Sequence, residues 1–320
     1  MTWMVTGAAG FIGLNLLERL AGQGASVVAL DQRAIPATVA EAFAPGTLHA
    51  VAGDTRDPAL LAGLMTRHGV TRVVHAAAIT PGPERERADP CAAVSVNLAG
   101  TAAALQAAAD SGVARFVHVS SVAVFGPGVP DGALIDEDRP HDPVTLYAIT
   151  KSASEAIVRR LAAVSGLPCV TGRLGVVFGR HEVETGVRDT MSPFWHATRH
   201  AQDGRPLVLP RPARRNWQYA TDAADALIAL GMATAPRHDT YNLGPSQVWT
   251  VADWCGMLAD RFPGFRHDIG DVPGAPIGLH NPSDGGLLSW QRFDAEFPAA
   301  RRPRITPEAA FADYMDWLGA

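Results

Sequence analysis

The chain Met1–Ala320 contains almost no lysine. Of its 27 basic residues 26 are arginine, and Lys151 is the single lysine. A lysine ammonium is a compact point charge with three rotatable donors, whereas a guanidinium is a rigid planar fork. A chain that uses arginine almost everywhere is expected to keep a lysine only where a guanidinium cannot replace it. Lys151 is therefore the first candidate for a functional residue.

Cysteine is also scarce. Cys91, Cys169 and Cys255 lie far apart in the sequence, and their number is odd. With no Cys-x-x-Cys pair, this spacing predicts neither a disulfide framework nor a zinc site. We expect buried, unreactive thiols and no metal site.

Long apolar runs and a strong net charge are missing as well. No apolar run is expected to approach the roughly 18–20 residues of a membrane span. Gly7 and Gly10 interrupt the apolar N-terminus, which therefore does not resemble a signal peptide. The net charge is −5 and the arginines are scattered, so no basic stripe for nucleic acid is predicted. We expect a cytoplasmic protein whose partner is a small molecule rather than a membrane or a nucleic acid.

Tyr147 precedes Lys151 by four residues. On a helix, residues at this spacing share one face. An ammonium beside a phenol favours the phenolate, and we expect it to lower the tyrosine pKa from its reference value of about 10. A tyrosine tuned in this way suits general acid/base catalysis. The alternative is a surface tyrosine and lysine that share a helix face without a function.

The N-terminus carries a glycine-rich turn between a strand and a helix. The apolar run 2–6 is followed by Gly7, Gly10 and Gly13, and then by an amphipathic helical pattern of Ile12, Leu16, Leu17 and Leu20. This context is the one that a dinucleotide-binding fingerprint requires. The first glycine makes the tight turn, the second admits the pyrophosphate, and the third allows close packing of helix on strand. The helix N-terminus then favours the anionic pyrophosphate.

An acid stands where such a fingerprint needs one. A second apolar strand, residues 25–30, ends at Asp31, 18 residues after Gly13. A carboxylate there accepts hydrogen bonds from the adenosine ribose hydroxyls and repels a 2′-phosphate. Arg33, close to Asp31 in the sequence, is a weaker signal that favours the 2′-phosphate of NADP. The sequence therefore favours NAD over NADP.

Apolar strands and helical segments alternate through most of the chain. Further buried strands are predicted at residues 72–75, 115–120, 168–173 and 240–243, with alanine-rich crossover helices such as 92–109 between them. This pattern predicts an α/β fold with a doubly wound parallel sheet. We assign residues 1–173 and about 219–245 to a nucleotide-binding domain. Residues from about 174 to 218 and from 246 to 320 are assigned to a small, discontinuous C-terminal lobe, with the substrate in the cleft between the two.

Two segments between these elements are expected to be irregular. Residues 80–90 are polar and rich in proline, and we expect a loop over the site that is mostly solvated. Residues 179–188 are charged and irregular. The closing helix is expected to begin at Thr306-Pro307, because a capping residue with proline in the first helical position starts a helix well.

The two motifs together resemble the extended short-chain dehydrogenases/reductases, the group that includes NAD-dependent sugar epimerases and dehydratases. Smaller matches at residues 75–78, 97–101 and 116–126 support the resemblance over most of the chain. It implies a Rossmann fold, NAD as cofactor and a Ser-Tyr-Lys triad. Counting back five residues from Gly126 gives Ser121 as the triad serine, with Ser120 as the second choice.

The resemblance extends the set of NAD-binding residues beyond the glycine turn. It places Asp54 against the adenine amino group and Lys151 on the nicotinamide ribose. The full predicted set is Gly7, Gly10, Phe11, Ile12, Gly13, Asp31, Asp54, Thr55, Ala76, Ala77, Asn97, Tyr147 and Lys151.

The implied chemistry is oxidation of a substrate hydroxyl. Tyr147 takes the hydroxyl proton, Ser121 binds the same oxygen, and a hydride passes from the carbon to nicotinamide. Val122 and Ala123 stand where family dehydratases carry an acid pair, so dehydration is not expected. We favour a dehydrogenase of a sugar, sugar acid or polyol. The alternatives are a UDP-sugar type epimerase with tightly bound NAD, and a redox-sensing NAD-binding module without turnover.

The predicted substrate residues are Ser121, Tyr147, Gly175, His196 and Arg215. Gly175 is interpreted as standing where UDP-sugar epimerases carry an asparagine that holds a diphosphate oxygen. Arg215 fits a phosphate, a carboxylate or a purely structural ion pair. His196 is a candidate for the sugar pocket, with packing in the lobe as its alternative. The resemblance also implies a homodimer through helices of the Tyr147 region.

Overall fold

The computed structural model describes residues 1–244, 247–270, 284–298 and 305–320. Its centre is a parallel sheet in the order β12-β7-β5-β4-β1-β2-β3. From β1 the chain builds the sheet outward in one direction through β2 and β3, and then in the other direction from β4. The strands are β1 (Thr2–Thr6), β2 (Ser26–Asp31), β3 (Leu48–Ala52), β4 (Val70–His75), β5 (Arg115–Ser121), β7 (Cys169–Leu174) and β12 (Thr240–Leu243).

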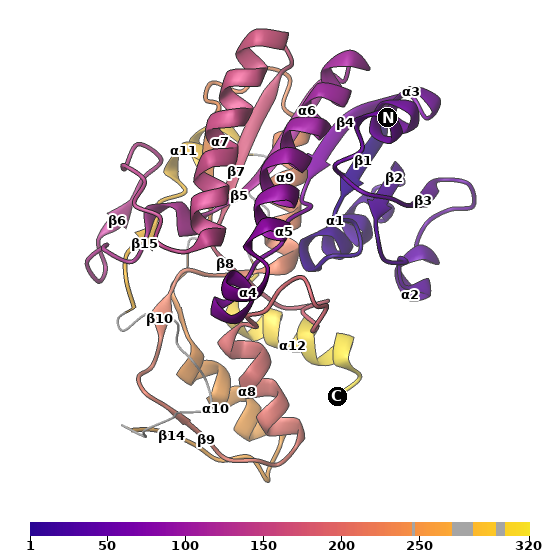
Figure 1. Ribbon diagram of the computed structural model, residues 1–320. Coiled ribbons are helices and arrows are strands. Elements are labelled where there is room, and N and C mark those ends of the chain that lie inside the picture. The colour runs from indigo at the N-terminus through magenta and orange to yellow at the C-terminus, as the bar shows by residue number, and fades with distance from the viewer. Residues whose placement is uncertain (245–246, 271–283, 299–304) are drawn as a thin grey trace.

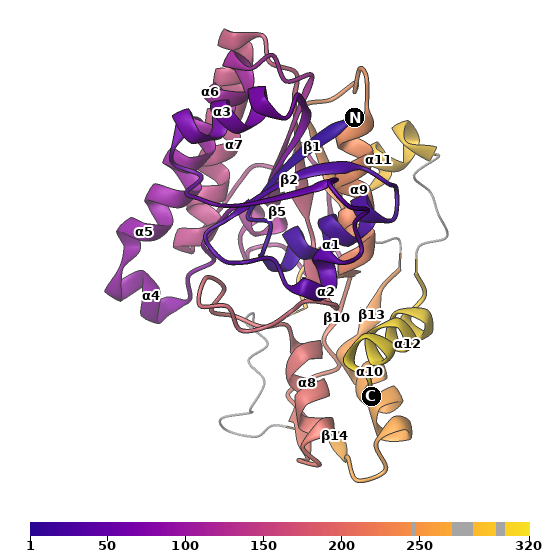
Figure 2. The ribbon, with the colours of Figure 1, turned by 90° about the vertical axis from the view of Figure 1, so that its right-hand side faces the viewer.

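Helices cover both faces of this sheet (Figures 1 and 2). One face packs under α1 (Phe11–Ala21), α2 (Ala37–Ala40), α9 (Ala220–Met232) and α11 (Gln291–Glu296). The other packs under α3 (Pro58–Arg67), α6 (Gly100–Asp110) and α7 (Leu146–Ser165). The doubly wound fold predicted from the sequence is therefore confirmed.

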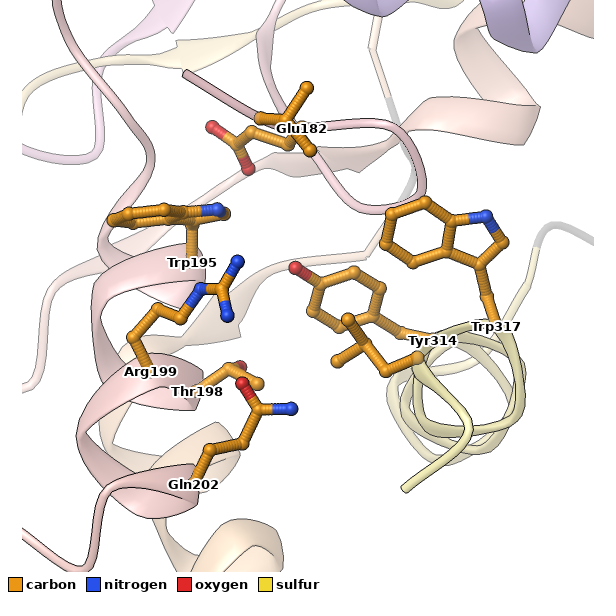
Figure 3. Close-up of a pocket in the computed structure, with 9 residues that line it drawn as sticks. Glu182, Trp195, Thr198, Arg199, Gln202, Tyr314 and Trp317 are labelled. Carbon is orange, nitrogen blue, oxygen red and sulfur yellow. The ribbon is translucent and has the colours of Figure 1, made fainter. Parts of the chain in front are cut away.

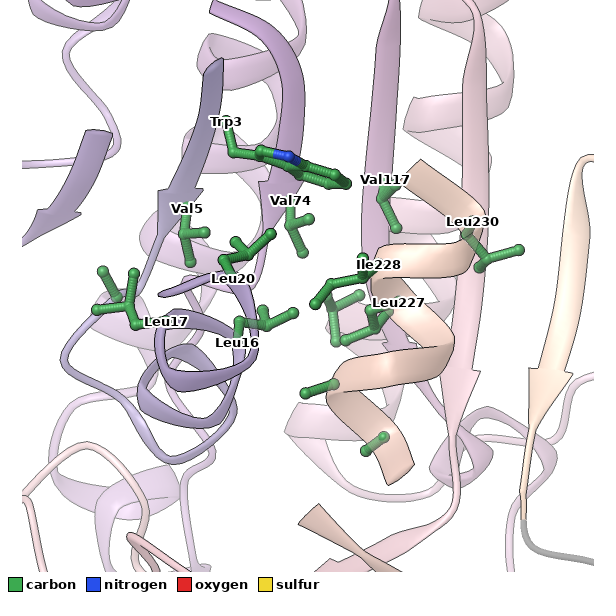
Figure 4. Close-up of a cluster of buried hydrophobic side chains, with 14 of the residues drawn as sticks. Trp3, Val5, Leu16, Leu17, Leu20, Val74, Val117, Leu227, Ile228 and Leu230 are labelled. Carbon is green, nitrogen blue, oxygen red and sulfur yellow. The ribbon is translucent and has the colours of Figure 1, made fainter. Parts of the chain in front are cut away.

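Successive side chains of the central strands point to opposite faces, as the pleat of a strand requires. Trp3 and Val5 join the cluster under α1 and α9, whereas Met4 joins the cluster on the other face. Figure 4 shows the first cluster, in which strand residues meet leucines of both helices. Its labelled members are Trp3, Val5, Leu16, Leu17, Leu20, Val74, Val117, Leu227, Ile228 and Leu230.

The alanine-rich segment 90–110 is continuous but not one regular α-helix. It consists of α5 (Pro90–Val94), a π-helical turn (Ser95–Ala99) and α6. By length and composition alone it would reach across a membrane, so the expectation that no apolar segment has that length is wrong. Its alanines pack against α3 and α7 instead, so this apolar face is buried inside the fold.

A second hydrophobic cluster builds the lobe. It gathers side chains from α8 (Pro193–Gln202), α10 (Val251–Arg261) and α12 (Pro307–Leu318) around the fully buried Trp254. Its short strands are β8 (Val176–Phe178), β9 (Leu207–Leu209), β10 (Arg214–Arg215), β11 (Trp217–Tyr219), β13 (Trp249–Thr250) and β14 (His267–Ile269). As predicted, α12 begins after Thr306, whose hydroxyl accepts from Ala309 N, with Pro307 in the first position.

One helix of the C-terminal stretch lies on the larger domain. We assigned residues 246–320 to the lobe, yet Phe293 of α11 is buried in the cluster on the sheet. Tyr241 Oη of β12 donates to Glu296 Oε2 at 2.5 Å. The short strand β15 (Leu287–Leu288), which precedes α11 in the chain, pairs with β6 (Leu134–Ile135). A burial pattern of six residues is too short to assign a helix to one domain or the other.

Candidate active site

The glycine turn lies at the switch point of the sheet, where β1 and β4 are neighbours. Gly7 has a φ of +68°, and a Cβ there would lie 2.6 Å from Ala77 Cα, just beyond the end of β4. A Cβ on Gly13 would lie 2.1 Å from Gly7 O. Side chains are thus excluded at both positions, and the backbone N–H groups at the start of α1 remain accessible to an anion. These residues fit the pyrophosphate of a dinucleotide.

Asp31 ends β2 beside this turn. Its Oδ2 accepts from Ala9 N at 3.0 Å, and its Oδ1 accepts from Arg33 N at 2.9 Å. Arg33 Nη2 in turn donates to Ala9 O at 2.7 Å. The carboxylate is therefore fixed at the strand tip, where it would meet the ribose hydroxyls of NAD. Arg33 is tied to the same turn rather than free to bind a 2′-phosphate.

The other predicted cofactor residues divide into two groups. Ala76 and Ala77 follow β4 directly against the glycine turn, and Thr55 is buried with no hydrogen-bond partner for its hydroxyl among the described residues. Asp54 forms an ion pair with Arg56, and its contact with the adenine amino group stays a prediction. Its hydrogen bonds with Arg56 lower the pKa of the Asp54 carboxyl.

Asn97 joins two elements of the site. Its Oδ1 accepts from Ile79 N at 2.8 Å, and its Nδ2 donates to Thr150 Oγ1 at 2.9 Å. The side chain lies in the π-helical turn, which displaces it from the regular helix pattern. Asn97 thus holds the segment after β4 against α7, the helix that carries the catalytic candidates.

The structure brings the three predicted triad residues together. The side chain of Ser121, the last residue of β5, hydrogen-bonds the phenol of Tyr147, which lies in the first turn of α7. Lys151 Nζ lies 5.9 Å from the centre of the Tyr147 ring and donates to Val119 O at 2.8 Å. Thr145 starts α7 by accepting from Ala148 N, which fixes the helix turn that presents Tyr147.

The pKa of Tyr147 differs from the sequence expectation. Burial raises the pKa of Tyr147, and hydrogen bonds with Ser121 and Thr80 and the charge of Arg188 oppose that rise. We expected Lys151 to lower this pKa. Burial also lowers the pKa of Lys151 itself, to about 8, and its ammonium is engaged with a carbonyl. The four-residue spacing predicted that Lys151 lies beside Tyr147, but it did not predict that burial shifts the pKa of both groups.

Ser120 has a different role from Ser121. Its hydroxyl donates to Glu155 Oε1 at 2.5 Å, two turns further along α7 than Tyr147. Glu155 Oε2 also forms a buried ion pair with Arg173 Nη2 at 2.7 Å. Arg173 Nη2 donates further to His141 Nε2 at 2.8 Å. This network ties β5, α7 and β7 together behind the triad.

The segment 179–192, here called the strap, crosses from β8 to α8 near the carboxyl ends of the strands (Figures 1 and 2). Asn15 Nδ2 of α1 donates to Arg180 O at 2.8 Å. At the other end Asp189 Oδ2 lies 2.7 Å from Arg85 Nε. The sequence predicted an irregular segment here, but it did not predict that Glu182 is buried in it.

The segment 80–90 is also more ordered than predicted. It contains the short helix α4 (Pro83–Ala88), and Glu86 Oε1 of that helix accepts from Leu146 N at the start of α7. Thr80 hydrogen-bonds the Tyr147 phenol. No sequence motif marks Thr80, Glu86 or Arg188 as residues of the site. The only signal in the sequence is that Thr80 follows a strand end that faces the site.

The three remaining substrate candidates lie in different surroundings. Gly175 N donates to Gln218 Oε1 at 3.1 Å, at the bend between β7 and β8. Arg215 Nε donates to Asp284 O at 2.5 Å, and burial lowers the pKa of its guanidinium. His196 packs edge-on against Trp195 in the lobe. Their roles in substrate binding stay predictions.

Trp195 lines a small cavity inside the lobe (Figure 3). Figure 3 shows Trp195, Thr198, Arg199 and Gln202 from α8 facing Tyr314 and Trp317 from α12, with Glu182 of the strap above them. Arg199 Cζ lies 5.3 Å from the centre of the Trp195 ring. The cavity therefore adjoins the strap.

The fold and the site define a nucleotide-dependent oxidoreductase class, and sequence comparison identifies the family. The profile of the NAD dependent epimerase/dehydratase family matches residues 3–244, so the chain belongs to that family. It is an NAD-dependent enzyme of the extended short-chain dehydrogenase/reductase type. The predicted family and cofactor are confirmed.

Relatives match nearly the whole chain. It is 33% identical to dTDP-6-deoxy-L-talose 4-dehydrogenase (NAD(P)(+)) of Kitasatospora kifunensis, over 91% of this chain and 86% of that protein. It is 32% identical to UDP-glucose 4-epimerase of Azospirillum brasilense, over 90% of this chain and 91% of that protein. The structure of the Thermus thermophilus UDP-glucose 4-epimerase in complex with NAD superposes with a TM-score of 0.79 at 25% identity, covering 100% of each chain.

Proposed function

We propose that this enzyme oxidises a hydroxyl-bearing carbon in the sugar of a nucleoside-diphosphate sugar, with exchangeable NAD. The observation that carries the proposal is the convergence of Ser121, Tyr147 and Lys151 on one edge of the sheet, beside the glycine turn. NAD, when bound, supplies the hydride acceptor. The relative from Kitasatospora is a dehydrogenase of a dTDP-sugar, which supports both the reaction and the substrate class.

The residues of the triad divide the proton chemistry among them. The Tyr147 phenolate accepts the proton of the substrate hydroxyl. The Ser121 hydroxyl donates to the same substrate oxygen and stabilises it while the charge shifts. Lys151, whose ammonium is fixed between α7 and β5, orients the nicotinamide ribose.

The arginines around Asp284 bear on the substrate. Arg211 Nε donates to the Asp284 carboxylate, Arg215 Nε to its backbone carbonyl, and Arg214 lies between them in the chain. A group of guanidinium forks at the lobe favours a diphosphate over a neutral sugar. This moves our preference from the free sugar, sugar acid or polyol of the sequence analysis to a nucleotide sugar.

An epimerase with tightly bound NAD is the second candidate. It is favoured by the relative from Azospirillum, which matches over almost its whole length. A dehydratase is disfavoured, because Val122 and Ala123 follow the triad serine and supply no acid for elimination.

One experiment separates the two candidates. The dialysed protein is denatured and the released nucleotides are quantified. An empty protein that reduces added NAD at 340 nm with a dTDP- or UDP-sugar is the result expected of the dehydrogenase. About one NAD released per chain, without net NADH formation, would favour the epimerase. If Tyr147→Phe retained either activity, the proposal of triad chemistry would be wrong.

A further inference from the structure

His75 is the last residue of β4 and is buried, with 1% of its surface exposed. In the parallel register of the sheet it lies opposite Thr6, the last residue of β1. Gly7 follows Thr6, and Ala77 is the second residue after His75. These two followers are in contact, because a Cβ on Gly7 would lie 2.6 Å from Ala77 Cα. His75 thus lies where both segments that fit the dinucleotide leave the sheet.

Both ring nitrogens of His75 hydrogen-bond a threonine hydroxyl. Nδ1 lies 2.8 Å from Thr6 Oγ1, and Nε2 lies 3.1 Å from Thr101 Oγ1 on α6. The Thr101 proton is already used, because this hydroxyl donates to Asn97 O at 2.7 Å. A hydroxyl has one proton, so Thr101 accepts from His75 and the ring carries its proton on Nε2. His75 Nδ1 then accepts from the Thr6 hydroxyl.

The other two protonation states of His75 fit these contacts less well. With the proton on Nδ1, the ring would donate to Thr6, and the Thr6 hydroxyl proton would have no acceptor among the described residues, since its other partner is the donor Ala77 N. A charged ring is disfavoured because burial, with a smaller effect of the Lys151 charge, lowers the pKa of His75 to about 3. The neighbouring ring of His118, 6.1 Å away, has a pKa that burial lowers in the same way.

Asn97 extends this chain of hydrogen bonds to the helix that carries Tyr147. Asn97 Nδ2 donates to Thr150 Oγ1 at 2.9 Å, and the Thr150 hydroxyl donates to Tyr147 O at 2.9 Å. The same amide group binds both Ile79 N and Ile79 O in the segment after β4. Every bond of the chain points the same way, from Thr6 to the backbone of Tyr147. Bonds aligned in this manner polarise and strengthen one another.

We propose that His75 is a positioning residue for NAD, whose neutral Nε2–H tautomer joins the strand end at the glycine turn to α6 and, through Asn97, to α7. His75 does not touch the cofactor. The N–H groups that meet the pyrophosphate follow directly after the strand end that His75 holds, so their placement depends on it. The inference goes beyond the proposed function, because it concerns the binding of NAD and not the sugar.

Loss of the ring would leave two buried groups without partners. Thr6 and Thr101 are 0% and 1% exposed, so water cannot readily replace the imidazole. The Thr6 hydroxyl would lose its acceptor, and the Thr101 oxygen would lose its donor. Buried polar groups that lose a partner rearrange to find another one. Because Thr6 directly precedes Gly7, such a rearrangement reaches the glycine turn.

The first experiment determines the tautomer in the folded protein. Long-range proton–nitrogen correlation spectra of protein labelled with nitrogen-15 histidine distinguish a protonated ring nitrogen from a bare one. The chain has 11 histidines, and the signals that disappear in His75→Gln assign those of His75. We expect a protonated Nε2 and a bare Nδ1, unchanged between about pH 5 and 8. A proton on Nδ1, or a charged ring in this range, would overturn the proposal.

The second experiment measures the binding of NADH by fluorescence titration. His75→Leu removes both hydrogen bonds, and we expect the dissociation constant to rise roughly tenfold. His75→Gln places an amide nitrogen near Thr101 and should restore most of the affinity. His118→Leu is the matched control, because His118 is equally buried on β5 but bonds Ser154 of α7 and not the strand end at the turn. It should lose stability and keep its affinity for NADH within about twofold.

Thr101→Val tests the same link if His75→Leu does not fold, since it keeps the shape of the side chain and removes its hydroxyl. It should also weaken NADH binding, and in the double variant with His75→Leu the loss should be smaller than the product of the two single losses. Single losses that multiply, an equal loss in His118→Leu, or full affinity in folded His75→Leu would each overturn the proposal. If no sugar nucleotide is turned over, the proposed function fails, while the NADH titrations still report on His75.

Discussion

Glu155 of α7 and Arg173 of β7 form a buried ion pair, with Glu155 Oε2 2.7 Å from Arg173 Nη2. Glu155 lies one helical turn after Lys151, and its other carboxylate oxygen accepts from Ser120, the neighbour of the triad serine. The Glu155 carboxylate thus joins the helix that carries Tyr147 to both β5 and β7, in addition to the contact of Lys151 with the Val119 carbonyl. The geometry of the triad depends on groups that do not face the substrate.

Breaking this pair should destabilise the fold. Glu155→Gln leaves the Arg173 guanidinium buried without a counter-charge, and removing one partner of a buried pair costs about 3–5 kcal/mol. Urea unfolding of the wild type and the variant measures the loss. The double variant Glu155→Gln, Arg173→Met should recover part of it, because no uncompensated charge remains. A loss below about 1 kcal/mol in Glu155→Gln would contradict the assignment.

Two adjacent serines should respond differently to alanine. Ser121→Ala removes the hydroxyl that faces Tyr147, and we expect turnover to fall by about 10²–10³-fold with little change in stability. Ser120→Ala removes the donor to Glu155 and should cost roughly 1–3 kcal/mol of unfolding free energy, with a smaller effect on turnover. Each variant is the control for the other. The reverse pattern would move the triad role to Ser120.

Asp31 should determine the choice of cofactor. Asp31→Ser removes the charge that repels a 2′-phosphate and also the carboxylate that pairs with Arg33, so binding of NADP should tighten relative to NAD, by roughly tenfold or more. Fluorescence titration with NADH and NADPH gives both dissociation constants. Asp54→Ser is the control, since Asp54 is paired with Arg56 and should not change the ratio. An unchanged ratio in Asp31→Ser would place the ribose elsewhere.

Stability should decline in mild acid because of buried histidines. Burial lowers the pKa of His75 to about 3, from a reference value of 6.5, and lowers the pKa of His118 well below the same value. Between about pH 3 and pH 6.5 the unfolded chain binds more protons than the folded one, because these histidines are protonated only in the unfolded chain. Stability should therefore be full above about pH 6.5 and fall as the pH drops toward 3, with a slope of about 1.4 kcal/mol per pH unit for each histidine.

Urea unfolding at several pH values measures this slope. His75→Gln keeps hydrogen-bonding groups near Thr6 and Thr101 but cannot take up the proton. Its slope between about pH 4 and 6 should be shallower than that of the wild type. Identical slopes in the two proteins would show that His75 is protonated in the folded state.

We propose a homodimer through α5 and α7, which contact each other. Val94 of α5 and Ile149 of α7 are 40% and 47% exposed, more than apolar residues of a monomer's core would be. Ile149→Arg should give a monomer by light scattering coupled to gel filtration. Val164→Arg, at the far end of α7 and 64% exposed, is the control and should leave the mass unchanged. A monomeric wild type would refute the proposal.

The sequence by itself determined the central sheet and the cofactor turn. Strand periodicity, the spacing of Gly7, Gly10 and Gly13, and the acid at Asp31 are local patterns, since each depends on the backbone within a few residues. The i,i+4 spacing of Tyr147 and Lys151 is local in the same sense. These features could be predicted because no distant contact changes them.

Only the tertiary structure decided the environment of the triad. Thr80 and Arg188 are 108 positions apart in the numbering, and they meet only where the strap pairs with the segment that follows β4. The choice of Ser121 over Ser120 depends on which hydroxyl meets Tyr147, because Glu155 binds the other one. Burial, and with it the pKa of Tyr147 and Lys151, is a property of everything packed around a group. A one-dimensional pattern carries the identity of the reacting groups, but their ionisation depends on the whole fold.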